Sequence, residues 1–170
     1  MTQSNRRMNS KLITFVATMC AVSNILGFFA IPIGITKIHL MQLPIILSGL
    51  ALGPWIGGLV GFIGATTMAF NLAPVNPYIL LGNAILGFFT GLFYLYLRKM
   101  KVSPIIPQVI SVLGAYLIQA PYVYVTDVYF MTMPPSLVLA ILVKLLLEDV
   151  ISVLLSHVIL FRVNIAQILQ

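Results

Sequence analysis

Long unbroken runs of apolar residues fill most of the chain, and short stretches rich in polar residues, proline or glycine separate them. Polar and apolar positions do not alternate within the runs, so the pattern favours helices over strands. A polar segment over residues 1–10 precedes the first run. The breaks between the runs predict six helices, over roughly 11–31, 40–53, 54–70, 78–97, 105–125 and 136–161.

The second and third predicted helices meet at Gly53-Pro54 with almost no loop between them. Proline lacks an N–H group and disfavours helix in the residue before it, so this dipeptide ends one helix and begins the next. Glycines recur behind it, and Gly57 and Gly61 share one face of the third helix. In lipid, such a face permits close contact between helices. An ordinary hairpin with a close-packed interior would use the same residues.

The composition places these helices in a membrane. Of the 170 residues, 61% are hydrophobic and only 7% are charged, whereas soluble domains carry roughly 25% charged residues. A spanning helix needs about 20 mainly apolar residues, and helices satisfy their own backbone hydrogen bonds in lipid. The first run lacks a convincing small-residue cleavage site, so we interpret it as a membrane helix and not as a removable signal. The sequence therefore predicts an all-α integral membrane protein with a single domain over residues 1–170.

Basic residues are few and lie near the ends of the predicted helices. Six helices put both termini on one side of the membrane, and that side holds Arg6, Arg7, Lys11, Arg98, Lys99, Lys101 and Arg162. Only Lys37 falls in a loop on the other side. Because positively charged segments stay in the cytoplasm, we expect cytoplasmic termini and outer loops at 32–39, 71–77 and 126–135. The net charge of +6 therefore reflects topology and does not indicate a nucleic-acid partner.

The last predicted helix contains Lys144, Glu148 and Asp149 within an apolar run. Ionisable groups at such depth are costly and mark a functional interior. With Ser152 and Ser156 they form one polar arc of about 140° on the helix. Lys144 and Glu148 are four residues apart and can neutralise each other. A structural ion pair that fixes helix packing is the alternative interpretation.

Other polar groups fall in the outer halves of the predicted helices. Asn83 and Gln119 are amides deep in apolar runs, where they need hydrogen-bonding partners. Tyrosines at helix ends also form interfacial belts, but rings and amides together can bind a planar polar molecule in a small cavity open to the outside. The predicted substrate-binding residues are Lys37, His39, Asn83, Gln119, Tyr122, Lys144 and Glu148.

The chain lacks a phosphate-binding loop, a zinc-protease motif and a nucleophile turn. We therefore expect no ATP hydrolysis by this chain, no catalytic residue, no metal site and no cofactor. A small membrane enzyme using Glu148 or Asp149 with His157 is a further hypothesis. It is disfavoured because these groups lie about two turns apart on different faces of the helix.

Two local features resemble one family of membrane proteins. The first predicted helix carries Ala17-Thr-Met-Cys-Ala21, and the Gly53-Pro54 turn is followed by Gly57 and Gly61. Together with the size and the six helices, they resemble the substrate-binding S components of energy-coupling factor (ECF) vitamin transporters of the prokaryotic cell membrane. The resemblance implies that Ala17 and Ala21 contact a transmembrane coupling protein.

The same resemblance implies a transport mechanism. An S component captures a vitamin or related micronutrient outside, docks on a module of one coupling protein and two ATPases, tips over in the membrane and releases its ligand inward. The ligand stays open at this point: pantothenate, riboflavin, a pyrimidine or pyridine vitamin and a deazapurine precursor all fit. A non-transporting membrane scaffold of similar fold, of the cell-shape type, is the alternative function.

Overall fold

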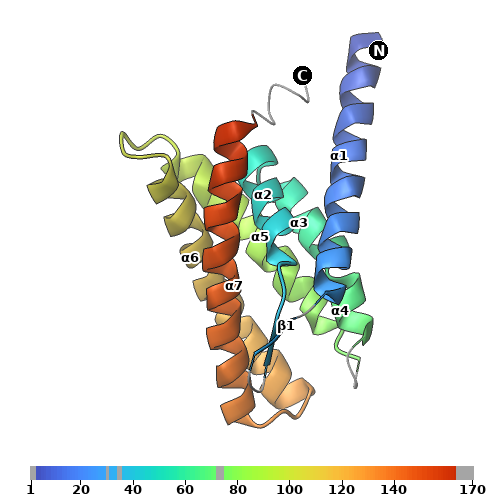
Figure 1. Cartoon of the computed structure of the whole chain (residues 1–170), viewed down its shortest axis with the longest axis vertical. Helices are drawn as coiled ribbons and strands as arrows, with labels where there is room; N and C mark the ends of the chain where they lie inside the picture. The colour runs from blue at the N-terminus through green and yellow to red at the C-terminus, as the bar shows by residue number, and fades with distance from the viewer. Residues whose placement is uncertain (1–2, 30, 34–35, 72–74, 164–170) are drawn as a thin grey trace.

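The computed structural model describes residues 3–29, 31–33, 36–71 and 75–163 of the chain. The described part is almost entirely helical, and its helices pack side by side into a bundle with both termini at one end (Figure 1). The helices are α1 (Gln3–Phe28), α2 (Gln42–Leu52), α3 (Pro54–Gly64), α4 (Thr66–Asn71), α5 (Tyr78–Leu97), α6 (Ile105–Val125) and α7 (Pro135–Arg162). Two short strands, β1 (Ile31–Ile33) and β2 (Thr36–Ile38), and one π-helical turn, η1 (Thr126–Phe130), complete the described elements.

Within the described residues, the helical segments that are long and apolar enough to cross a membrane are Ser10–Phe28, Tyr78–Leu97 and Ile105–Phe130. The outer surface of the bundle carries large apolar side chains, such as Trp55, which is 79% exposed, and Phe161, which is 80% exposed. Polar side chains such as Gln42 and Glu148 are instead fully buried. This arrangement suits a protein whose surroundings are lipid.

A single residue joins α2 to α3. Gly53 has a φ of 91°, a left-handed conformation that favours glycine, and Pro54 occupies the first turn of α3. Behind this turn, α3 packs directly on α5. A Cβ atom on Gly57 would collide with the Gly87 carbonyl oxygen, and one on Gly61 would collide with the Asn83 carbonyl oxygen. The two backbones are therefore in direct contact, and glycine is required at both positions.

The structure differs from the single helix predicted over 54–70, because that helix is interrupted at Ala65. The side chain of Asn24 on α1 satisfies the backbone groups released there. Its Oδ1 accepts the Thr67 N–H at 2.7 Å, and its Nδ2 donates to the Ile63 carbonyl at 3.0 Å. An amide on a neighbouring helix thus replaces the hydrogen bonds that a continuous helix would make.

The first outer connection, predicted as a loop over 32–39, contains an antiparallel hairpin. β1 pairs with β2 in the register Ile31↔Ile38, Pro32↔Lys37 and Ile33↔Thr36. These strands are rich in β-branched residues, which favour extended backbone. The first helix also differs from its predicted bounds of 11–31, since α1 begins at Gln3 and ends at Phe28. Figure 1 shows the hairpin in the half of the bundle opposite the termini.

Candidate functional site

A cavity of about 360 Å³ lies in the half of the bundle opposite the termini. Its walls come from the beginning of α5, the end of α6 with η1, and the first half of α7, and the connection before α2 closes one side. Apolar side chains form much of the wall, as in most small-molecule sites. The residues that contribute polar side chains are His39, Asn76, Tyr78, Asn83, Gln119, Thr126, Asp127 and Lys144.

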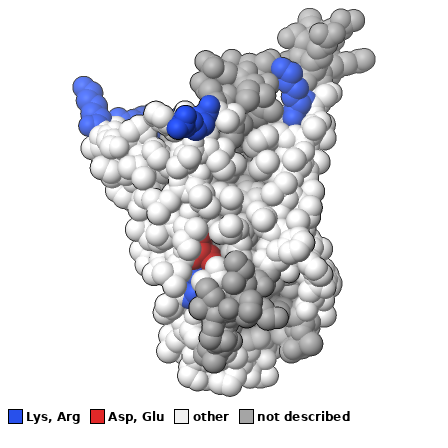
Figure 2. Space-filling view, viewed as in Figure 1, with Lys and Arg blue, Asp and Glu red and all other residues white. Residues whose placement is uncertain are grey.

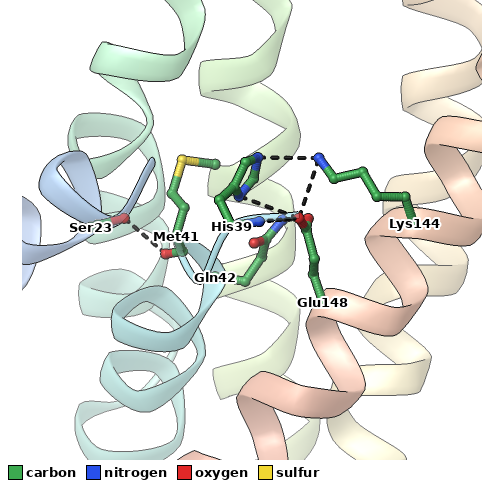
Figure 3. Close-up of polar contacts among 6 residues, drawn as sticks. All are labelled: Ser23, His39, Met41, Gln42, Lys144 and Glu148. Atoms are coloured by element: carbon green, nitrogen blue, oxygen red, sulfur yellow. Dashed lines mark hydrogen bonds and ion pairs between the residues drawn. The ribbon is translucent and has the colours of Figure 1, made fainter. Parts of the chain in front are cut away.

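The buried carboxylate of Glu148 holds the connection between β2 and α2 against α7 (Figure 3). Its Oε1 accepts the backbone N–H of His39 at 2.7 Å, and its Oε2 accepts the Gln42 Nε2 at 3.2 Å. The Lys144 Nζ lies 3.4 Å from Oε1, one helical turn away on α7. Hydrogen bonds to a charged group are stronger than neutral ones. Glu148 therefore fixes the connection between β2 and α2, which closes one side of the cavity.

The contact between Lys144 and His39 defines the protonation of the imidazole ring. The Lys144 Nζ lies 3.1 Å from His39 Nε2, and an ammonium group can only donate. His39 Nε2 must therefore accept. Burial, reinforced by the charge of Lys144, lowers the pKa of His39 in the connection before α2 to about 4. The neutral ring then carries its proton on Nδ1, which faces Glu148 Oε1 at 3.5 Å.

A second contact anchors the same connection from the opposite side. The Ser23 hydroxyl on α1 donates to the Met41 carbonyl at 2.9 Å (Figure 3). Since Glu148 binds His39 two residues earlier, the chain between the hairpin and α2 is held between α1 and α7. His39 and Met41 reach the cavity wall from this anchored segment.

Two buried amides present unused acceptors at the cavity. Asn83 Nδ2 donates to the Ile79 carbonyl at 2.9 Å, which fixes the orientation of the amide. Its Oδ1 and the Gln119 Oε1 have no hydrogen-bond partner among the described residues. Leaving a buried polar group unpaired is costly. A ligand that donates hydrogen bonds would satisfy both.

Another of the chain's three acidic residues, Asp127, lies at the cavity on η1. Its Oδ1 accepts a hydrogen bond from Asn76 Nδ2 at 2.9 Å, while Asn76 Oδ1 accepts the Tyr78 N–H at 3.1 Å. Asn76 thus binds the first N–H of α5 and also positions Asp127. Sequence reasoning interpreted Asn76, which precedes Pro77, only as a loop residue. Its position two residues before the helix predicted over 78–97 was the available signal.

The structure brings together four of the seven residues predicted to bind substrate: His39, Asn83, Gln119 and Lys144 line the cavity. Of the other three, Tyr122 and Glu148 do not line it. The Tyr122 hydroxyl donates to the Tyr78 carbonyl at 3.2 Å and supports the wall from behind. Glu148 lies behind Lys144 and His39. Lys37 is in β2, and its side chain lies outside the described part.

The polar arc predicted on α7 faces the interior of the bundle. Glu148, Asp149, Ser152 and Ser156 are all fully buried. Neither carboxylate oxygen of Asp149 has a hydrogen-bond partner among the described residues.

A second pocket, of about 330 Å³, lies at the other end of the bundle beside Arg98 and His157. His157 Nδ1 lies 2.9 Å from Gln108 Oε1, so this histidine joins α7 to α6. In the described part of the chain it forms no ion pair with Glu148 or Asp149. This geometry gives no support to an enzyme that uses His157 with either carboxylate.

The fold is similar to that of solved structures, two of which are S components of ECF transporters. The first is described as the S component of a bacterial ECF transporter and has a TM-score of 0.69, with 18% identity over 99% of both chains. The second is the S component for biotin from an ECF-type ABC transporter, with a TM-score of 0.67 and 23% identity over 95% of this chain and 93% of that chain. The predicted six-helix S-component fold is therefore confirmed.

The sequence itself identifies the family. Residues 7–166 match the family described as ECF-type riboflavin transporter, S component. The chain belongs to this family of S components, which are integral membrane proteins that bind the substrate of a transporter. No match was found among the curated proteins.

Proposed function

We propose that this chain is the high-affinity substrate-binding subunit of an ECF-type importer and that its cavity captures riboflavin outside the cell. It delivers the vitamin inward by docking on a module of one transmembrane coupling protein and two ATPases. The observation that carries this proposal is the cavity opposite the termini, which is lined by the buried amides Asn83 and Gln119, whose side-chain oxygens have no partner among the described residues.

The distribution of charge supports an outward-facing cavity. Figure 2 shows the described Lys and Arg side chains gathered mainly at the end of the bundle that carries the termini. These include Arg98 and Lys99 after α5 and Arg162 at the end of α7. Segments rich in Lys and Arg stay in the cytoplasm. The opposite end, with the hairpin and the cavity, is then outside.

The chemistry of riboflavin suits this cavity. The molecule combines a flat tricyclic ring, an imide N–H between two carbonyl groups, and a chain of hydroxyl groups. The cavity of about 360 Å³ falls within the size range of small-molecule pockets. Its apolar wall can contact the ring, while Asn83 and Gln119 can accept hydrogen bonds from the imide and hydroxyl groups.

Riboflavin fluorescence provides the test of this assignment. Titration of the purified full-length chain in mild detergent is expected to quench the fluorescence of one riboflavin per chain. Gln119→Leu removes an acceptor at the cavity and should weaken binding about tenfold, the effect of one hydrogen bond.

Gln108→Leu is the matched control, because it makes the same change on the same helix at the far pocket. It should leave the riboflavin Kd within about threefold of the parent value, a change of less than 1 kcal/mol. Saturating concentrations that produce no quenching would contradict the proposed ligand. Equal effects of the two variants would contradict the proposed site.

The exposed face of α1 supports docking on a coupling protein. Ala17 and Ala21 are both exposed on this face. The neighbouring hydroxyls of Thr14 and Thr18 donate to carbonyls one turn back on the same helix, at 2.9 and 2.8 Å. Small side chains with internally bonded hydroxyls allow another helix to approach closely.

Ala17→Trp is expected to abolish riboflavin uptake by cells while the purified variant binds riboflavin as tightly as the parent. The indole would hold the docking helix away without touching the cavity, which α1 does not line. Leu117→Trp on α6 is the control, since Leu117 is already 70% exposed on another helix. Radiolabelled uptake and the fluorescence titration together decide the result. Normal uptake by Ala17→Trp would contradict the docking face.

A further inference from the structure

The charges around the cavity can be assigned because the chain has only three acidic side chains. Glu148 is paired with Lys144 at 3.4 Å and lies behind the wall. Asp149 is fully buried in the bundle and does not line the cavity. Asp127 is therefore the only carboxylate that lines it.

Lys144 offers little net attraction to an anion. Glu148 neutralises it directly, and the neutral His39 accepts one of its hydrogen bonds. Among the described side chains, no basic group lies within 4.0 Å of Asp127. The described wall of the cavity thus holds one carboxyl group, that of Asp127, without a basic partner.

Several of the remaining groups that line the cavity offer acceptor atoms. Asn83 donates one amide hydrogen to the Ile79 carbonyl, and its oxygen has no partner among the described residues. The Thr126 hydroxyl likewise donates to the Tyr122 carbonyl at 3.0 Å, which leaves its lone pairs for a ligand. A ligand that brings N–H or O–H groups would pair these atoms, whereas one that brings only acceptors would leave them unsatisfied.

We propose that the cavity selects an uncharged ligand rich in N–H and O–H donors and that Asp127 excludes the phosphorylated or carboxylated counterparts of that ligand. This inference rests on the proposed function, because it explains how the cavity would accept riboflavin and reject riboflavin 5′-phosphate. Bringing like charges together in a binding site is strongly unfavourable. Asp127 is thereby a residue that determines specificity.

Competition against bound riboflavin in the purified full-length chain tests the proposal. Riboflavin 5′-phosphate is expected to bind at least about 100-fold more weakly than riboflavin, and riboflavin methylated at the imide nitrogen about tenfold more weakly. In Asp127→Asn the ratio of the phosphate Kd to the riboflavin Kd should fall about tenfold, because the repulsion is removed. An unchanged ratio in this variant, or a phosphate that binds the parent as tightly as riboflavin, would overturn the proposal.

Asp149→Asn is the matched control, since it removes the same charge from a carboxyl that does not line the cavity. In this variant the ratio of the phosphate Kd to the riboflavin Kd should equal that of the parent. A fall in this ratio as large as in Asp127→Asn would overturn a local role for Asp127. If no flavin binds at all, the proposed ligand is wrong, but the proposed exclusion of anions can still be tested. Binding of pantothenate is then compared with that of panthenol, and binding of biotin with that of biotinamide. Tighter binding of either anion than of its uncharged counterpart overturns the proposed exclusion.

Discussion

Glu148→Ala is expected to cost about 3–5 kcal/mol in the free energy of unfolding, the usual effect of removing one partner of a buried ion pair. The substitution leaves the Lys144 ammonium without its carboxylate and the His39 N–H without its acceptor. Because these contacts hold the connection before α2 against the cavity, riboflavin affinity should fall at least about 100-fold, or more than about 2.7 kcal/mol. Thermal unfolding in detergent and fluorescence titration measure the two effects.

Two further variants separate the contributions of charge and hydrogen bonding. Glu148→Gln keeps an acceptor for the His39 N–H but loses the charge, so its stability should lie between that of the parent and that of Glu148→Ala. The double variant Glu148→Leu with Lys144→Met removes both charges and should recover stability relative to Glu148→Ala, because no buried charge stays unpaired. The double variant should still bind riboflavin weakly, since Lys144 lines the cavity. A Glu148→Ala protein as stable as the parent would contradict this role of the carboxylate.

Gly57→Leu is expected to prevent formation of the folded bundle. A Cβ atom at this position would collide with the Gly87 carbonyl of α5, and backbone cannot move aside as a flexible side chain does. The cost should therefore exceed the ~1–3 kcal/mol typical of overpacked sites. Circular dichroism and size-exclusion chromatography in detergent should show loss of the compact, monodisperse protein.

Gly58→Ala is a control on the next residue of α3. Its added Cβ would meet the Phe88 Cβ at 3.3 Å and the Ala84 carbonyl at 3.6 Å, contacts that small side-chain shifts can accommodate. This variant should fold and bind riboflavin. A folded, ligand-binding Gly57→Leu protein would show that α3 and α5 do not pack backbone to backbone.

Those features of the fold that depend on local sequence could be predicted. Apolar runs in a chain with 7% charged residues predict membrane helices. Apart from closed barrels, only helices satisfy all backbone hydrogen bonds in lipid. The polar arc of α7 could also be predicted to face inward, because charged groups avoid lipid. Glu148 and Asp149 are accordingly fully buried.

Features that depend on contacts between distant residues could not be predicted. The His39 N–H and the Glu148 carboxylate that binds it are 109 positions apart in the chain, and no local pattern indicates the pair. The interruption at Ala65 depends in the same way on Asn24 of another helix. Depth and polarity identified Glu148 as important, but only the packing shows that it stands behind the cavity wall and holds His39 and Lys144.

Mass spectrometry of the small molecules released on denaturing the purified protein tests the central claim most directly. The chain is purified in mild detergent from cells grown with riboflavin, and the released compounds are identified and quantified per chain. We expect about one riboflavin per chain in the parent and a large loss in Glu148→Ala that is purified in folded form. A protein that is empty, and that stays empty after soaking in a mixture of water-soluble vitamins, would contradict substrate binding and favour the membrane scaffold.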